Sequence, residues 1–234
     1  ASDIKQLGTI LSIWAHPDDE SFMAGGVMAA AVNNGQKVIC VTATKGEAGV
    51  QDESLWPASR LASIRASEME ESLATIGITI HHWLGYPDGG CKDVDQATAI
   101  GKLTQLIDRY QPDTILTVGP DGITSHDDHK AVSRWATKAA AGRNIAVYHA
   151  ILTPSVYEKM QAADSRFNLF FNVDKPLLAS PQRCAILLDL DKELLKKKYQ
   201  CLCAMPSQTK KMFEYFGEKA ICEMLSTEAF VANA

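Results

Sequence analysis

The sequence predicts an α/β protein with a Rossmann-like, three-layer fold, in which a mostly parallel sheet lies between helices and a C-terminal extension follows. Short β-rich runs alternate with helical patterns through the first 150 of the 234 residues. These runs lack a two-residue polar alternation, which is typical of strands buried on both faces. Hydrophobic residues make up 46% and charged residues 22% of the chain, which is enough apolar material for a sizeable core.

The predicted elements follow one another in a regular order. The β-rich runs are Thr9–Ala15, Lys37–Ala43, Thr79–Leu84, Thr114–Val118 and Ile145–Ala150. The helical patterns between them are Ser21–Asn33, Ala58–Ile76, Gln96–Tyr110 and His129–Ala141. Asn34-Gly35 and Gly77 supply stop signals after the first two helices. Strands separated by helices in this way form right-handed crossovers, and these build a parallel sheet.

The last third of the chain is less regular. We expect strands at Leu169–Val173 and Ala185–Leu190, and helices at Lys192–Ala204 and Lys210–Leu225. This tail is too short for a separate domain, so residues 1–234 are interpreted as one domain whose C-terminal extension covers one side of the site. Loops at 44–57, 86–95 and 153–168 are expected to set specificity.

Charge and cysteine usage exclude several classes of partner. The net charge of -5 gives no electrostatic reason to expect nucleic acid or an anionic membrane. No apolar run approaches the roughly 20 residues that span a bilayer. No basic segment followed by an apolar one is visible at the start, and the six cysteines form no regular framework. We therefore expect a cytoplasmic protein with reduced thiols.

Two clusters of metal-competent residues lie beyond predicted strands. His16-Pro17-Asp18-Asp19-Glu20 directly follows the first strand, and His126-Asp127-Asp128-His129 begins eight residues beyond the fourth. Taken alone, the first cluster is also a good helix N-terminus and the second a plausible surface turn. Ligands in open α/β sheets bind beyond the carboxyl ends of strands. Two such clusters at two strand ends together favour a metal site.

The residue types suggest how such a site would work. Catalytic zinc needs three protein ligands and an open position. His16 and Asp19 are three residues apart at a strand-to-helix turn, and one of His126 and His129 completes the set. This ligand type suits zinc, with Fe(II) or Co(II) as alternatives. Asp18 is free to move protons as a general base, and His126, held by Asp128, can stabilise an oxyanion.

These residues carry a resemblance to a known family. Ala15–Glu20 (AHPDDE) and Ser125–His129 (SHDDH) resemble the signatures of the LmbE/PIG-L family of zinc-dependent N-acetylglucosaminyl deacetylases. The second departs from the family's G-H-P-D-H at Ser125 and Asp127. Further similar features are Lys45–Gly49, Arg65 with Glu68, Pro87–Gly89 and Ser207-Gln208. Some family deacetylases carry a Tyr where this chain has Thr124.

The resemblance implies a role for each position. It makes His16, Asp19 and His129 the zinc ligands, Asp18 the general base, and His126 the oxyanion partner, oriented by Asp128. It places Arg65 and Asp88 in the substrate pocket, and we add Glu47 as a third substrate-binding candidate. Family precedent also implies a homo-oligomer, a trimer or a hexamer.

Three functions are therefore compared. The leading hypothesis is hydrolysis of an N-acetyl amide on a small amino sugar or sugar conjugate, by metal-activated water. The second is a metal-dependent phosphoesterase, because acidic-His runs also occur in that class, although two-metal sites need more bridging carboxylates. The third is a non-catalytic carbohydrate-binding protein on the same scaffold, against which the presence of Asp18 argues.

Overall fold

The computed structural model describes residues 3–233, and it confirms the predicted α/β class. Within this range a seven-stranded sheet has the order β3-β2-β1-β4-β5-β7-β6. The strands are β1 (Ile10–Trp14), β2 (Val38–Thr42), β3 (His81–Trp83), β4 (Thr114–Val118), β5 (Ala146–Ala150), β6 (Ile186–Asp189) and β7 (Thr227–Ala232). The first five strands in the sequence are parallel, whereas β7 is antiparallel to both of its neighbours.

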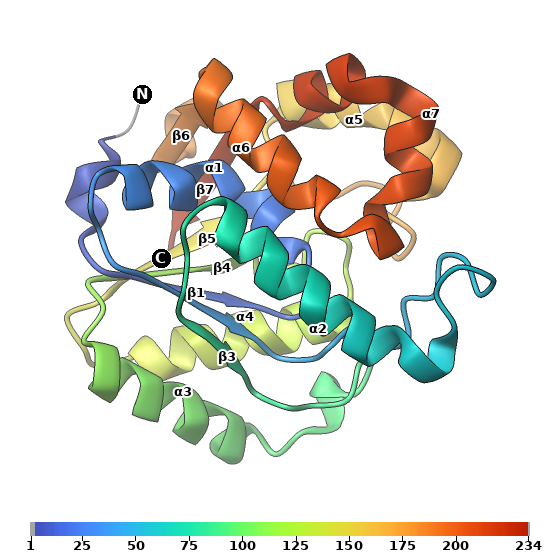
Figure 1. Cartoon of the computed structure of the whole chain (residues 1–234). Coiled ribbons are helices and arrows are strands. Elements are labelled where there is room, and N and C mark those ends of the chain that lie inside the picture. Colours follow the sequence, from blue (N-terminus) through green and yellow to red (C-terminus); the bar gives the residue numbers. More distant parts are fainter. Residues whose placement is uncertain (1–2, 234) are drawn as a thin grey trace.

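Helices cover both faces of the sheet (Figure 1). They are α1 (Asp19–Asn33), α2 (Ala58–Thr75), α3 (Gln96–Tyr110), α4 (Asp127–Ala140), α5 (Pro154–Phe167), α6 (Lys192–Cys203) and α7 (Pro206–Leu225), with 3-10 turns at Ile4–Leu7, Cys91–Asp93 and Pro181–Arg183. α3 and α4 pack together on one face, while α1, α2 and α6 pack on the other. α5 and α7 lie together beyond the end of the second group (Figure 1).

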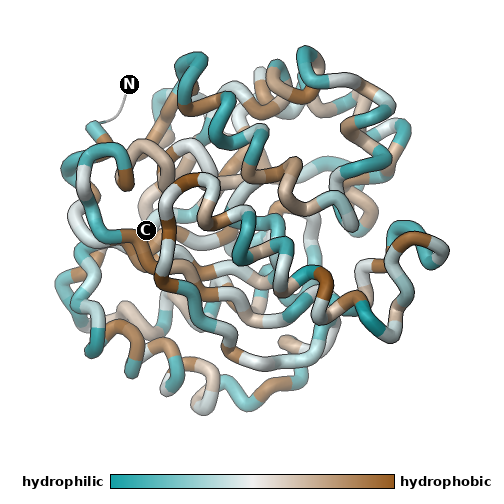
Figure 2. Tube along the Cα trace, viewed as in Figure 1, coloured by the Kyte–Doolittle hydropathy of each residue, from teal (hydrophilic) through white to brown (hydrophobic). Residues whose placement is uncertain are grey.

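Alternation along the strands builds the two halves of the core. In β1, Ile10 and Trp14 face the layer of α1 and α2, whereas Leu11 and Ile13 face the layer of α3 and α4. All four side chains are fully buried. Figure 2 shows the hydrophobic residues gathered along the central strands, with hydrophilic residues on the outer sides of the helices. The unbroken apolar runs of the sequence therefore reflect a sheet covered on both faces.

The C-terminal third corrects the sequence-based prediction in four places. Leu169–Val173 was predicted to be a strand but is a turn after the left-handed residue Asn168. The segment 153–168, predicted to be a loop, contains α5, which Thr153 caps by accepting the N–H of Val156. The strand β7 was not predicted, and α7 begins at Pro206 rather than Lys210.

No helix in residues 3–233 has the length and apolarity needed to cross a bilayer.

Candidate metal centre and active site

The two predicted clusters meet at the carboxyl ends of neighbouring strands. β1 delivers the segment that begins at His16, and the loop after β4 delivers the segment that begins at His126. From β1 the chain proceeds outward through β2 to β3 and then returns to the other side of β1 at β4. The site therefore lies at the point where the strand order reverses, which is where such sheets bind ligands.

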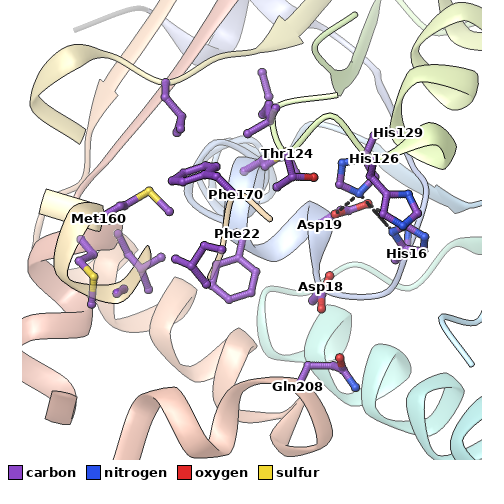
Figure 3. A pocket seen from close by; sticks show the side chains of 18 of the residues that line it. His16, Asp18, Asp19, Phe22, Thr124, His126, His129, Met160, Phe170 and Gln208 are labelled. Atoms are coloured by element: carbon purple, nitrogen blue, oxygen red, sulfur yellow. Dashed lines mark hydrogen bonds and ion pairs between the residues drawn. The ribbon is translucent and has the colours of Figure 1, made fainter. Parts of the chain in front are cut away.

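Three side chains present donor atoms to one point. His16 Nδ1 lies 3.1 Å from His129 Nε2 and 3.7 Å from Asp19 Oδ2. His129 Nε2 lies 3.2 Å from Asp19 Oδ1. Donors around a tetrahedral zinc ion, each at about 2.0–2.1 Å, are separated by about 3.3 Å. The chemistry and the spacing of this donor set therefore fit a zinc-type ion (Figure 3).

Contacts on the far side of each ring set which nitrogen faces that point. His129 Nδ1 lies 2.9 Å from the carbonyl of Gly122, which can only accept, so Nδ1 carries a proton and Nε2 is the nitrogen that faces the other donors. His16 Nε2 lies 3.2 Å from Asp128 Oδ2 and 3.0 Å from Asp88 Oδ1, which leaves Nδ1 for a metal. Carboxylates and carbonyls behind metal-binding imidazoles fix their orientation in this way.

A second group of His16, His126 and Asp128 also has donor atoms close together. Its Asp128 carboxylate is already occupied, since it accepts the N–H groups of Gly89 at 2.7 Å and Cys91 at 2.9 Å. The nitrogen of His16 next to this carboxylate is Nε2, at 3.2 Å, and Asp88 also holds that nitrogen. The set of His16, Asp19 and His129 is therefore the better metal site.

The charges of the site suit a cation. Burial lowers the pKa of His16, but hydrogen bonds to Asp128 and Asp88 and the charge of Asp19 outweigh it and raise the pKa to about 10. Burial raises the pKa of Asp19, but the charge of His129 and its hydrogen bond reverse this and bring the pKa below its usual range. A metal ion at His16 Nδ1 would replace the proton there and pair with the Asp19 carboxylate, while Nε2 keeps its contacts with Asp88 and Asp128.

Asp18 stands beside this donor set in a strained conformation. Its φ of 108° is unusual for a residue with a side chain, and the buried carboxylate of Glu20 accepts its N–H at 3.1 Å. Its own carboxylate lies 3.2 Å from Arg65 Nη2. Burial raises the pKa of Asp18 to about 6, against the lowering effect of the Arg65 charge. A carboxylate with this pKa suits proton transfer near neutral pH.

A strained loop brings His126 to the opposite side of the site. Gly122, Ile123 and Ser125 all have positive φ, and His126 then caps α4 by accepting the N–H of Asp128 on Nδ1 at 3.2 Å. We expected the Asp128 side chain to orient His126; its carboxylate instead contacts His16, and only its backbone contacts His126. The cap geometry explains the difference, because the Nδ1 of a capping histidine turns toward the helix backbone.

The three predicted substrate residues gather next to Asp18 and His16. Arg65 is 3% exposed and donates to the carbonyls of Gly46, at 2.7 Å, and Pro17. Asp88 accepts the N–H of Ala48 at 2.8 Å, and the N–H of Asp88 donates to Glu47 Oε1 at 3.0 Å. Burial raises the pKa of Asp88, but the hydrogen bond to His16 overcomes it and brings the pKa to about 2. Arg65 and Asp88 line the cavity of the site, whereas Glu47 supports it from behind.

Sequence reasoning missed the apolar part of this cavity. The cavity has a volume of about 510 Å³ and extends from His16 and His126 to side chains of α5, α7 and the turn at 168–173. In Figure 3 the histidines lie at one end, Thr124 and Phe22 in the middle, and Phe170 and Met160 toward the other end. The only signal in the sequence was the apolar run at Leu169–Val173, which we had interpreted as a strand.

Comparison with known proteins identifies the family. The model of the PIG-L family, described as GlcNAc-PI de-N-acetylase, matches residues 11–140, which is more than half of the chain and includes both metal clusters. The chain belongs to the PIG-L family. A relative from Mycobacterium sp. (strain KMS), 1D-myo-inositol 2-acetamido-2-deoxy-alpha-D-glucopyranoside deacetylase, is 33% identical over an alignment of 151 residues, and the match covers 56% of this chain and 49% of that protein. This PIG-L chain thus spans about half the length of the curated relatives that it matches.

Solved structures share the fold over the whole chain. N,N'-diacetylchitobiose deacetylase from Pyrococcus horikoshii superposes with a TM-score of 0.68 at 24% identity, covering 98% of this chain and 85% of that one. The zinc-inhibited form of teicoplanin deacetylase Orf2 gives 0.68 at 17% identity, covering 96% and 98%. GalB, a 4-carboxy-2-hydroxymuconate hydratase from Pseudomonas putida, gives 0.64 at 16% identity, covering 97% and 96%. The fold is therefore shared with a hydratase, so the reaction must be argued from the PIG-L site itself.

Proposed function

We propose that this chain is a metal-dependent hydrolase that removes the N-acetyl group from a small amino sugar or sugar conjugate. The observation that carries the proposal is the convergence of His16, Asp19 and His129 at tetrahedral spacing beside Asp18. The name of the family and of its mycobacterial relative supports the N-acetyl amino-sugar class. We propose zinc as the ion, with Fe²⁺ or Co²⁺ as alternatives of the same ligand preference.

The chain's own groups divide the reaction between them. When bound, zinc supplies Lewis acidity that brings the pKa of water to about 7. Asp18 takes the proton of the attacking water and returns it to the amide nitrogen as the C–N bond breaks, which releases acetate and a free amine. His126 donates a hydrogen bond to the oxygen on which negative charge develops. Arg65 holds Asp18 in place and, together with Asp88, contacts the sugar.

Turnover by the metal-loaded chain tests this proposal. We would deplete the protein of metal, restore one equivalent of Zn²⁺, Fe²⁺ or Co²⁺, and measure acetate release from N-acetylglucosamine, its inositol conjugate and N,N'-diacetylchitobiose. Asp18→Asn is expected to lower kcat by about 10²–10⁴-fold, the usual contribution of a general base, while metal affinity is retained. An unchanged kcat in Asp18→Asn would contradict the mechanism.

The alternatives predict other results. A two-metal phosphoesterase would bind two ions per chain, whereas the two donor groups of the described residues share His16 and favour one. Hydrolysis of a phosphoester together with two bound ions would establish that class. A binding protein would retain sugar affinity and release no acetate with any of the three metals.

The six cysteines are all free within the described residues, which supports the proposed cytoplasmic location.

A further inference from the structure

An apolar chamber adjoins the metal site in the same cavity. We define it by Ile123, Leu152, Val156, Met160, Phe170 and Met224. These side chains come from the loop before α4, the strand-to-helix connection after β5, α5, the turn at 168–173 and α7. The cavity of about 510 Å³ is of the size that holds a drug-sized ligand. An acetyl methyl group would fill only a small part of it.

The chamber opens onto the reacting end. Figure 3 shows Thr124 and Phe22 between the histidines and the side chains of Phe170 and Met160, with a continuous space alongside them. Phe171 lies at the entrance, 57% exposed, with its ring centroid 6.2 Å from that of His126. An apolar group attached to the reacting carbonyl therefore finds an apolar route from His126 inward.

The charged groups in the chamber wall are satisfied within the protein. Lys198 Nζ lies 2.7 Å from Glu228 Oε1, and both side chains are 1% exposed. Glu228 also accepts the N–H groups of Gly26 and Val27, each at 2.7 Å. A ligand in the chamber therefore meets no free charge, which suits a neutral hydrocarbon.

The other end of the cavity is polar and partly unsatisfied. Arg65 and Asp88 line this end, and Arg65 Nε has no hydrogen-bond partner among residues 3–233. Gln208 also lines the cavity, on the side of Asp18 away from the histidines (Figure 3). Hydroxyl groups of a sugar are the ligands that such an end would bind. The cavity thus has a polar end, which includes Asp18, Asp19 and the histidines, and an apolar end, which is the chamber.

The proton path decides which part of the substrate enters each end. Asp18 must reach the leaving nitrogen, and its carboxylate is held on the Arg65 side at 3.2 Å. The amine with its sugar therefore occupies the polar end, and the other substituent of the carbonyl points away from it. We propose that the substrate carries an N-acyl chain of medium length, longer than acetyl, and that this chain occupies the apolar chamber. The inference rests on the amide hydrolysis proposed above and replaces the acetyl group of that proposal by a longer acyl group, so the products are a medium-chain carboxylate and the free amino sugar.

Competition between acyl groups tests the proposal. We would compare kcat/KM of the metal-loaded chain for N-octanoylglucosamine and N-acetylglucosamine. Each buried methylene contributes a gain of roughly fourfold. We therefore expect kcat/KM to be at least about tenfold higher for the octanoyl compound, which is a modest part of the gain that its additional methylenes could supply. An equal or lower kcat/KM for the octanoyl compound would overturn the inference. So would a preference for octyl N-acetylglucosaminide over N-octanoylglucosamine, because the chamber would then hold a group on the amine side.

Binding of the acyl product separates this inference from the proposed function. Octanoate is expected to bind at least about tenfold more tightly than acetate in calorimetry, whether or not either amide is cleaved. If neither amide is cleaved while octanoate binds, the proposed hydrolysis fails and the chamber stands as a hydrocarbon site. If acetamides are cleaved and octanoate binds no better than acetate, the chamber assignment fails alone.

A matched pair of substitutions on α5 locates the effect. Met160→Trp replaces an unbranched side chain of the chamber by a bulky indole ring. This variant is expected to lower the octanoyl-to-acetyl ratio of kcat/KM at least about tenfold. Gln161→Trp adds the same ring at the next residue, whose side chain is exposed and outside the cavity, and should leave the ratio unchanged. Met224→Trp repeats the test from α7, with circular dichroism to confirm folding. An unchanged ratio in folded Met160→Trp and Met224→Trp would refute the proposal.

Discussion

At the scale of single residues, His16 shows how one side chain joins the metal site to its supports. Its Nδ1 faces Asp19 and His129, while its Nε2 lies within 3.2 Å of both Asp128 and Asp88. Asp128 is fully buried and fixed by two backbone N–H groups. A metal ion bound to Nδ1 would therefore depend on a carboxylate that never touches it.

Neutralising that carboxylate is expected to weaken metal binding. Asp128→Asn should raise the Kd for zinc by about 10–100-fold, the usual effect of losing such a support. Competition with a chromophoric chelator measures the Kd. Asp127→Asn is the matched control, because the side chain of the neighbouring Asp127 is more than half exposed and pairs with the exposed Lys92 at 3.5 Å. Equal zinc affinities in the two variants would refute the supporting role of Asp128.

The sequence motifs predicted which residues gather at the site but not all of their contacts. The spacing of His16 and Asp19 at a strand end is enough to place both on one turn, and the structure brings His129 to them. The direction of the Asp128 side chain depends on the position of Gly89 and Cys91, which belong to another loop. A contact between loops far apart in sequence cannot be derived from the spacing within either loop.

His81 lies at the start of the edge strand β3, and its buried ring is expected to make the free energy of unfolding depend on pH. Burial, aided by the charge of His82, lowers the pKa of His81 from 6.5 to about 4, and its Nε2 lies 3.0 Å from Thr42 Oγ1. The folded state therefore favours the neutral ring. Its contribution to the free energy of unfolding is fully present above pH 6.5 and is lost as the pH falls from about 6.5 to about 4.

Removing this imidazole should flatten the pH dependence. In His81→Gln the free energy of unfolding is expected to fall less steeply between pH 6.5 and 4 than in the original protein, by up to about 1.4 kcal/mol per pH unit. Urea denaturation at a series of pH values measures it. Around pH 8, where the ring is neutral in both the folded and the unfolded state, the difference in free energy of unfolding between the two proteins should not change with pH. Parallel curves through the acid range would show that His81 is not the group responsible.

At the scale of secondary-structure elements, α1 lies unusually close to the C-terminal extension. A Cβ added to Gly26 would lie 2.3 Å from Leu190 Cδ2, and one added to Gly25 would lie 3.3 Å from Lys198. The close approach is to the segment after β6 and to α6, rather than to the sheet.

Two glycine substitutions separate helix propensity from this packing. Gly26→Ala is expected to lower the free energy of unfolding by about 1–3 kcal/mol, because overpacking outweighs the gain in propensity. Gly101→Ala, in α3 and with nothing within 4 Å of the new Cβ, should raise it by up to about 1 kcal/mol. Denaturant titration of both variants measures the difference. Stabilisation by both substitutions would mean that Leu190 moves aside at little cost.

The elements that the sequence predicted well are those with local signals. Buried strands followed by helices repeat through the first 150 residues, and each was placed to within a few residues. α5 and β7 were not predicted, because the contacts that stabilise them involve distant parts of the chain. The apolar residues of α5 face the cavity and α7, and β7 is a strand only because it pairs with both β5 and β6. Such pairing is a property of the whole sheet.

At the scale of the whole molecule, the proposed metal ion would join segments that are far apart in the chain. His16 and Asp19 follow β1, whereas His129 belongs to α4, 110 residues after Asp19. The unfolded chain holds no such arrangement, so an ion that binds the folded state stabilises it by mass action. The Asp19 carboxylate and His16 Nδ1 would also exchange their mutual contact for contacts with the ion.

Metal binding is therefore expected to raise the melting temperature. An ion at 1,000 times its Kd contributes about 4 kcal/mol, which corresponds to a rise in Tm of about 8–16 °C for a domain of this size. Differential scanning calorimetry of metal-depleted and zinc-loaded protein measures the shift. Asp19→Asn should lose most of the shift, because it removes a ligand charge from the site. Asp18→Asn should keep it, since Asp18 is assigned to proton transfer rather than to the ion. The same shift in both variants, or none in the original protein, would contradict this division between the two adjacent aspartates.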